Sequence, residues 1–251
     1  MQLDPQQLAD SHSYEQVRDR LEQENRPDYL SDFVYGAIDG TVTTFAVVSG
    51  VAGADLSSSI VIILGFANLI GDGFSMAASN FLGTRTDMQL HEKIRNREAA
   101  EIEAYPEGER EEVRQIYAAK GFSGELLESV VSTITADKQR WIDTMMTEEM
   151  GLSLTRRSPL RAASATMIAF LFVGLIPLLP FIVELVSAES ILRPYVVSSV
   201  MAAAAFFFVG AIKSRFVQQR WYWSGLETLL VGGSAAVLAY GVGMALGNLS
   251  A

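Results

Sequence analysis

Five apolar stretches alternate with polar stretches along the chain, and their lengths predict five membrane-spanning helices. Each stretch is 18 to 25 residues long, close to the roughly 20 residues that a helix needs to cross a hydrocarbon core of about 30 Å. The predicted spans are 33–54, 59–83, 162–186, 195–212 and 225–249. The fold class we expect is all-α, a polytopic membrane protein with a helical insertion between the second and third spans.

This pattern divides the chain into four parts. Residues 1–30 are polar with semi-apolar positions at helical spacing, which is typical of either a short amphipathic helix or a loosely ordered tail. Residues 31–83 hold the first two spans, 84–160 form the insertion, and 161–251 hold the last three spans. The second span continues without a strong breaker into the charged insertion, so one long helix is expected there.

Breaker and capping residues predict about three helices in the insertion. Pro106 should end one helix near Tyr105, Gly121 should end another, and Ser123 is placed to cap a third. In the last span, Gly243 and Gly247 stand at the GxxxG spacing that allows close helix contact. Their spacing fits packing within the chain as well as it fits packing between two subunits.

Composition removes several classes of function. The chain has 49% apolar residues, a positive mean hydropathy and a formal charge of -10. Nucleic-acid binding is excluded because no basic stripe is available to neutralise phosphates. Cysteine is absent, which excludes disulfides and thiolate chemistry. The two histidines, His12 and His91, form no Glu-x-x-His pair, and no hydrolase, phosphate-loop or dinucleotide motif occurs. We therefore expect neither an enzyme nor a tightly bound cofactor.

The distribution of Lys and Arg predicts the orientation. Of the 19 basic residues, only Arg193 falls on the side opposite to the N-terminus and the insertion. The positive-inside rule then places the N-terminus and the insertion in the cytoplasm and the C-terminus outside. With no signal peptide or organelle-targeting segment visible, a bacterial inner membrane is the expected location.

Two acidic residues lie inside predicted spans. Asp39 follows the start of the first span and precedes Gly40, while Asp72 and Met76 stand one helical turn apart in the second. An ionisable group in hydrocarbon is costly and usually faces a bundle interior or a water path. Asp72 could instead bond a neighbouring helix, and Asp39 could lie at the membrane interface.

The insertion contains acidic pairs at helical spacing. Glu98 and Glu101, then Glu109 and Glu112, are each three residues apart, which places both carboxylates of a pair on one helix face. Such like charges favour a cation or a proton between them. Carboxylates suit Mg, Ca, Mn and ferrous iron, and a nearby thioether favours the later metals. The alternative is that these glutamates form an ordinary solvated face.

Several separated motifs, in order, resemble the vacuolar iron transporter family, as a bacterial-type member. They are VYGAIDGTVTTFAVVSGVAGA, LIGDGFSMAASNFLG, the paired glutamates and MMTEEMGL, and the resemblance covers roughly residues 30–249. It implies a homodimer of five-helix protomers with a cytoplasmic three-helix metal-binding domain after the second span. It also implies exchange of Fe(II), and often Mn(II) or other divalent metals, for protons.

The resemblance assigns roles to particular residues. It makes Asp39, Asp72 and Met76 the translocation path, and makes Glu98, Glu101, Glu109, Glu112, Met145 and Glu149 the cytoplasmic metal ligands. Two positions depart from the family pattern. Met146 stands where relatives have a glutamate, for which Glu148 could substitute, and Asn80 replaces a glutamate near the cytosolic mouth. Both departures favour a softer site.

The resulting hypothesis is a proton-coupled transporter that moves Fe(II), and Mn(II) with it, out of the cytosol. The insertion would capture the ion, which then passes Asp39, Asp72 and Met76 at the interface of a homodimer in the lipid bilayer. The alternative is a membrane-anchored metal sensor or buffer without transport. A transporter of small organic cations is less favoured, because the spans offer no aromatic cage around the acids.

Overall fold

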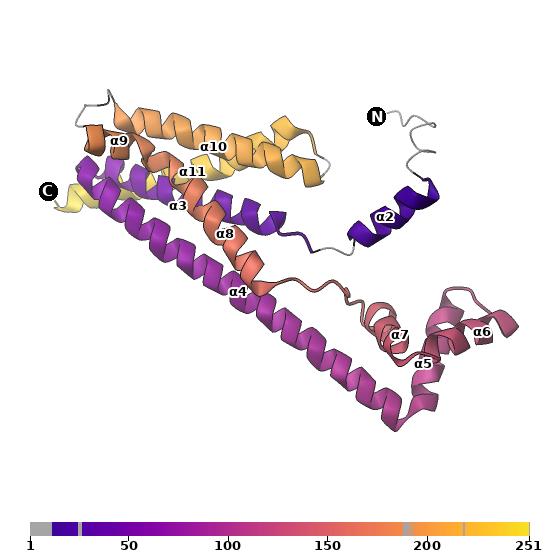
Figure 1. The fold of residues 1–251 in the computed structure, drawn as a ribbon. Coiled ribbons are helices and arrows are strands. Elements are labelled where there is room, and N and C mark those ends of the chain that lie inside the picture. Colours follow the sequence, from indigo (N-terminus) through magenta and orange to yellow (C-terminus); the bar gives the residue numbers. More distant parts are fainter. Residues whose placement is uncertain (1–11, 25–26, 188–190, 192, 218, 251) are drawn as a thin grey trace. The chain divides into compact units, whose positions relative to one another are not determined.

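The computed structural model describes residues 12–24, 27–187, 191, 193–217 and 219–250, and most of these residues are helical (Figure 1). No strand occurs among these residues. Within the same described ranges, five helical segments are long and apolar enough to cross a membrane. The predicted fold class, an all-α polytopic membrane protein, is confirmed.

The spans agree with the predicted stretches to within a few residues. They are α3 (Leu30–Gly53), the first part of α4 (Ser58–Ala104), α8 (Pro159–Gly174) with α9 (Leu179–Ser187), α10 (Pro194–Val217) and α11 (Trp221–Ser250). As expected, α4 continues from the second span into the insertion as one helix. Its 47 residues correspond to a length of about 70 Å, more than twice a bilayer core.

The third span is confirmed as one membrane-length segment, Pro159–Ser187, but it is not a single unbroken helix. A 3₁₀ turn at Ile176–Leu178 separates α8 from α9. Pro177 has no backbone N–H and its ring clashes with the preceding turn, which interrupts a helix. The Ser198 hydroxyl of α10 donates a hydrogen bond of 2.6 Å to the Pro177 carbonyl. A backbone group at the break is thereby satisfied within the protein, as lipid requires.

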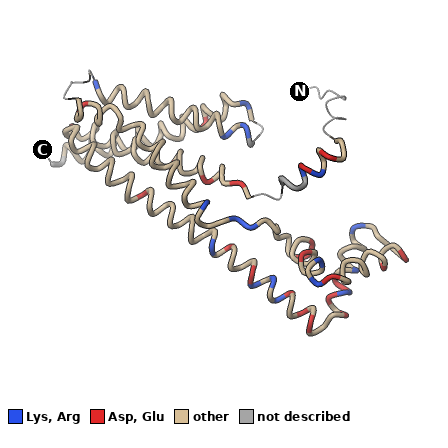
Figure 2. The backbone as a smooth tube through the Cα atoms, viewed as in Figure 1, with Lys and Arg blue, Asp and Glu red and all other residues tan. Residues whose placement is uncertain are grey.

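The chain forms two compact units. The membrane unit comprises Tyr29–Gly83 and Pro159–Ala251, and the insertion unit comprises Met1–Asp28 and Thr84–Ser158. Lys, Arg, Asp and Glu are sparse in the spans and dense on α2 (Tyr14–Glu24), the second part of α4 and the helices that follow (Figure 2). The predicted N-terminal segment is a helix over Tyr14–Glu24, whereas residues 1–11 and 25–26 lie outside the described part.

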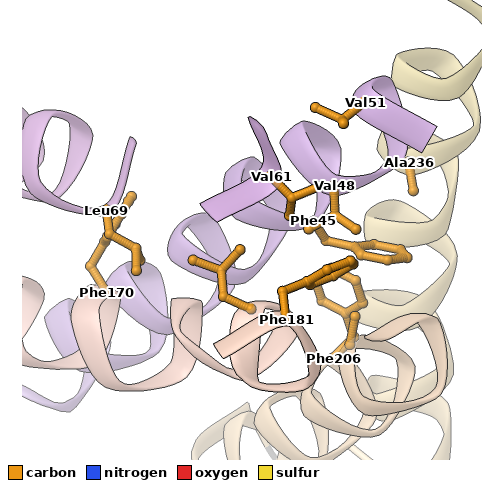
Figure 3. Packing of buried hydrophobic residues seen from close by; sticks show 11 residues of the cluster. Phe45, Val48, Val51, Val61, Leu69, Phe170, Phe181, Phe206 and Ala236 are labelled. Atoms are coloured by element: carbon orange, nitrogen blue, oxygen red, sulfur yellow. The ribbon is translucent and has the colours of Figure 1, made fainter. Parts of the chain in front are cut away.

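In the membrane unit, α3 is the central helix and packs against α8, α10 and α11. Its apolar core is built largely from aromatic and β-branched side chains (Figure 3). The rings of Phe45 and Phe206 meet edge to face, with centroids 6.4 Å apart. Phe170, Phe181 and Leu69 extend the same cluster.

Glycines allow the backbones of these helices to approach closely. A Cβ added at Gly36 would lie 2.4 Å from the Thr166 carbonyl oxygen of α8. A Cβ at Gly243 would lie 2.1 Å from the Gly50 carbonyl oxygen of α3, and Gly247 lies against Ala54. The GxxxG pair of α11 therefore packs against α3 within the chain, which is one of the two alternatives left open by its spacing.

The insertion unit consists of the second part of α4, α5 (Pro106–Ala119), α6 (Gly124–Thr135), α7 (Lys138–Thr144) and a π-helical turn (Met145–Glu149). Pro106 and Gly121 act as predicted, since α5 begins at Pro106 and Gly121 follows it with φ of 98°. Ser123 precedes α6 but makes no side-chain cap. Ser123 therefore occupies the predicted N-cap position of α6 without the side-chain hydrogen bond, whereas Asp137 does cap α7 by accepting from the Arg140 backbone N–H.

Gly243→Ala should destabilise the protein by about 1–3 kcal/mol, because the new methyl group has no room against the Gly50 carbonyl oxygen. Gly241→Ala in the same helix is the matched control, since a Cβ there meets nothing within 4 Å. The control should be neutral or slightly stabilising, because alanine favours a helix over glycine. Thermal unfolding in detergent measures both, and equal melting temperatures would contradict this packing.

Candidate functional site

Five glutamates from three elements act on one another electrostatically in the insertion unit, and we call them the acid cluster. They are Glu98 and Glu101 of α4, Glu109 and Glu112 of α5, and Glu149 at the end of the π-helical turn. All five were predicted from the sequence. The paired spacing puts two carboxylates on one face of α4 and two on one face of α5, and the fold brings the two faces together.

The acid cluster has a buried floor and an exposed rim. Glu98 is 1% exposed and Glu109 is 8% exposed, whereas Glu101, Glu112 and Glu149 are open to solvent. One carboxylate oxygen of Glu109, Oε2, is buried without a hydrogen-bond partner. A buried acceptor in this state is costly, so the floor of the cluster favours a proton or a cation.

Burial and mutual repulsion make these acids harder to ionise. Burial, followed by the charges of Glu112 and Glu98, raises the pKa of Glu109 to about 7. Burial and the charge of Glu101 raise the pKa of Glu98, although the neighbouring Arg97 acts in the opposite direction. Burial and the charge of Glu98 likewise raise the pKa of Glu149. Since a divalent ion also needs deprotonated oxygens, protons and metal would compete for the same carboxylates.

A π-helical turn, Met145–Glu149, carries two methionines and ends at Glu149 of the acid cluster. The Met150 backbone N–H donates to the Met145 carbonyl oxygen five residues earlier, at 3.2 Å. Such wide turns occur frequently at functional sites. Here the turn buries Met145 completely, in an apolar group that also contains Ile102 and Val113. These two residues directly follow Glu101 and Glu112 in the sequence.

The residues that depart from the family pattern in this turn have other partners. The Met146 sulfur lies 3.6 Å from Nη1 of Arg95, which also donates to Asp143 at 2.9 Å. Met146 lines a cavity of about 780 Å³ in the insertion unit, and the acid cluster does not contribute to its lining. Glu148, considered as a substitute ligand, forms an ion pair with Lys120.

In the part of the chain that the structure describes, no three His, Cys, Asp or Glu side chains converge closely enough to hold a metal ion as they stand. The carboxylates of the acid cluster would therefore have to close around an ion. Three of the five are exposed, and an exposed glutamate changes rotamer readily.

In the membrane unit, the predicted path residues lie on α3 and α4. Asp39 is half-buried, and its carboxylate is near enough to Asp72 for the two to repel each other. Met76 is half-buried against the apolar core of the unit. Two carboxylates and a thioether therefore lie on facing helices, a set that could replace part of the water shell of a divalent cation.

Asn68 connects Asp72 to the central helix. Its amide Nδ2 donates to Oδ2 of Asp72 at 2.7 Å, and its Oδ1 accepts from the Thr44 hydroxyl of α3 at 3.4 Å. This chain of hydrogen bonds fixes one end of Asp72 while the side chain remains exposed in the single chain.

Sequence reasoning missed a second polar contact between these helices. The Asn80 amide donates to Oδ1 of buried Asp32 at 2.9 Å and to the Thr166 hydroxyl of α8 at 2.7 Å. Helical spacing was the available signal, because Asp32 lies seven residues before Asp39 and Asn80 lies four after Met76. The Asn80 amide therefore connects α4 to α3 and α8. A glutamate at this position, as in the family pattern, would instead place a second carboxylate against Asp32.

Comparison with known proteins gives a family match that contains both the acid cluster and the path residues. The VIT family matches residues 30–244. A vacuolar iron transporter of Toxoplasma gondii is 34% identical over 226 residues, covering 87% of this chain and 74% of its own length. Vacuolar iron transporter 1 of Oryza sativa subsp. japonica is 32% identical, with 87% and 86% covered. That of Arabidopsis thaliana is 31% identical, with 85% and 84% covered.

The metal-free protein should lose stability as the pH rises from about 5 to about 8. The pKa of Glu109 in the folded protein, about 7, is above the ordinary value of 4.5, so the folded state binds this proton more tightly than the unfolded state. Its contribution is fully present below about pH 4.5 and is lost as the pH rises through about 7. Melting temperatures of the metal-free protein in detergent measure the effect.

Glu109→Gln should flatten this pH dependence, because the amide does not ionise. Glu111→Gln on the same helix is the control, since Gln115 and Arg114 lower the pKa of Glu111 instead. The control should keep the slope of the unmodified protein between about pH 5 and 8. A slope that survives Glu109→Gln unchanged would contradict the assignment.

Proposed function

Because the chain belongs to the VIT family, we propose that it carries iron out of the cytosol across the membrane that its five spans cross. Three relatives that cover most of the chain are named as vacuolar iron transporters, which supports iron as the cargo. The observation that carries the proposal is the presence of two acidic sites within the matched residues, one in the spans and one in the insertion. No reaction is proposed at either site.

The acid cluster is the proposed capture site for Fe(II) and Mn(II). Its five carboxylates repel one another, and the orphaned Oε2 of Glu109 lacks a partner that an ion would supply. Carboxylate oxygens suit ferrous and manganous ions, and Met145 beside them favours the later divalent metals over magnesium. The ion is the cargo of this site, held long enough to raise its concentration at the membrane.

Asp39, Asp72 and Met76 are the proposed path through the spans. The ion exchanges part of its water shell for their oxygens and sulfur, which lowers the cost of its passage through hydrocarbon. The same carboxylates accept protons when the ion leaves. Proton and metal then compete for one site, which couples export of the metal to entry of protons.

A homodimer would complete this path. Asp72 is exposed in the single chain, and on the same helix Ile70 is 63% exposed and Phe74 is 68% exposed. A carboxylate facing lipid at this depth is costly, so a second copy of the chain over this face of α4 is favoured.

The distribution of basic residues supports a cytosolic insertion and N-terminus. A bacterial inner membrane stays a prediction, since the relatives are named as vacuolar.

Asp39→Ala or Met76→Ala should abolish iron uptake into proteoliposomes that carry a pH gradient, because each removes a ligand from the path. Uptake of ⁵⁵Fe(II) under reducing conditions measures the flux. Asp55→Asn is the control, since Asp55 is exposed in the turn between α3 and α4. Its positive φ of 55° is tolerated by asparagine.

Flux that persists in both Asp39→Ala and Met76→Ala would refute the path. Protein that binds metal but shows no flux under either direction of the pH gradient would instead favour the sensor or buffer alternative. Acidification of the external medium in step with metal uptake into the vesicles would support the exchange of protons for metal.

Replacing Glu101 and Glu112 together with glutamine should weaken Mn(II) binding at least about tenfold, which corresponds to about 1.4 kcal/mol of lost interaction. Both residues are exposed, so the fold should persist. Calorimetry on the full-length protein in detergent measures the affinity. Glu107→Gln with Glu111→Gln is the matched control on α5, and equal losses in the two double variants would contradict a site at the acid cluster.

A further inference from the structure

Arg97 is a cation placed directly against the acid cluster. Its Nη2 donates to Oε1 of Glu98 at 3.2 Å, and its Nε donates to Oε2 of Glu101 at 3.3 Å. Its charge also acts on Glu149. One guanidinium therefore joins the buried floor of the cluster to its exposed rim, and it uses two of the oxygens that would face an incoming ion.

The two ends of this contact differ in their freedom to move. The side chain of Glu98 is 1% exposed, whereas that of Arg97 is 57% exposed. Glu98 is enclosed by the protein, but the guanidinium can rotate into water without losing solvation. The ion pair can therefore open from the arginine side.

A guanidinium and a divalent metal ion cannot share this position. Like charges repel strongly at short range where water is partly excluded, and the oxygens that Arg97 occupies are among the metal ligands proposed above. In the metal-free cluster, the same guanidinium offsets part of the repulsion among the glutamates. Its presence thus stabilises the empty cluster and opposes metal binding.

We propose that Arg97 is the counter-ion of the empty acid cluster, and that an arriving divalent cation displaces its guanidinium from Glu98 and Glu101. This inference rests on the proposed function of the cluster as a metal site. The competition weakens metal binding, which suits a site that passes its ion onward. Arg97 is a positioning residue, since it sets the affinity without being a ligand.

Arg97→Gln should raise the affinity for Mn(II) by roughly two- to fivefold, the range expected for loss of one partly exposed charge interaction. Calorimetry with Mn(II) on the full-length protein in detergent measures this change. The affinity of Arg97→Lys should lie between those of the unmodified protein and Arg97→Gln, because lysine keeps the charge but not the two-pronged geometry. Arg114→Gln is the control, since Arg114 pairs with Glu111 and Glu128 outside the acid cluster, and its affinity should match the unmodified protein.

Thermal unfolding separates a counter-ion from a merely structural arginine. Metal-free Arg97→Gln should melt below the unmodified protein, because the glutamates lose their internal cation. With saturating Mn(II) the two should melt together, since the displaced arginine no longer contributes. A structural role would lower both melting temperatures equally, and that outcome would overturn the proposal.

The remaining outcomes are also decisive. If the unmodified protein binds no Mn(II), the acid cluster is not a metal site and this inference fails with it. If the unmodified protein binds Mn(II) while Arg97→Gln binds equally or more weakly, the metal site stands and the counter-ion proposal is overturned. Should Arg97→Gln not fold, Arg97→Met takes its place, because it also removes the charge, and unchanged affinity in that variant would overturn displacement.

Discussion

Close backbone contact around α3 is the constraint on which the membrane unit depends. Lipid chains are as apolar as leucine, so helices in a membrane associate through tight packing and polar contacts rather than through hydrophobic burial. Gly36 and Gly40 leave room for the backbone of α8, and Gly50 and Gly53 face α11. Asp39 lies directly before Gly40, so its position on the central helix is set by contacts that leave no space for one added carbon atom.

Opposing forces meet in the acid cluster. The apolar side chains Ile102, Val113 and Met145 pack together. Ile102 lies one helical turn after Glu98, and Val113 lies one turn after Glu109, so the same packing draws these two glutamates out of water. The cost appears as the raised pKa of both residues. The burial of two of its acids distinguishes the cluster from the fully solvated acidic face that sequence alone also allowed, and a proton or a cation would offset its repulsion.

Local patterns predicted most of the fold, because each depends on residues close together in the chain. The apolar lengths gave the five spans, Pro106 and Gly121 gave helix boundaries in the insertion, and the spacing of three gave the carboxylate pairs of the acid cluster. What failed depends on distant partners or on competing local choices. The break at Pro177 was not predicted, because a proline near a helix end can be tolerated. The contact between Asn80 and Thr166 spans 86 residues of chain, a separation that no periodicity encodes.

The burial of Glu98 and Glu109 has a consequence for how long the protein survives in a cell. A fold that keeps two acids under its surface is weakest when nothing neutralises them, and a bound ion stabilises the folded state by mass action. If the acid cluster binds iron as proposed, scarcity of iron would make the insertion open more often and become accessible to proteases. The abundance of the exporter would then follow the supply of its cargo, without any separate sensor.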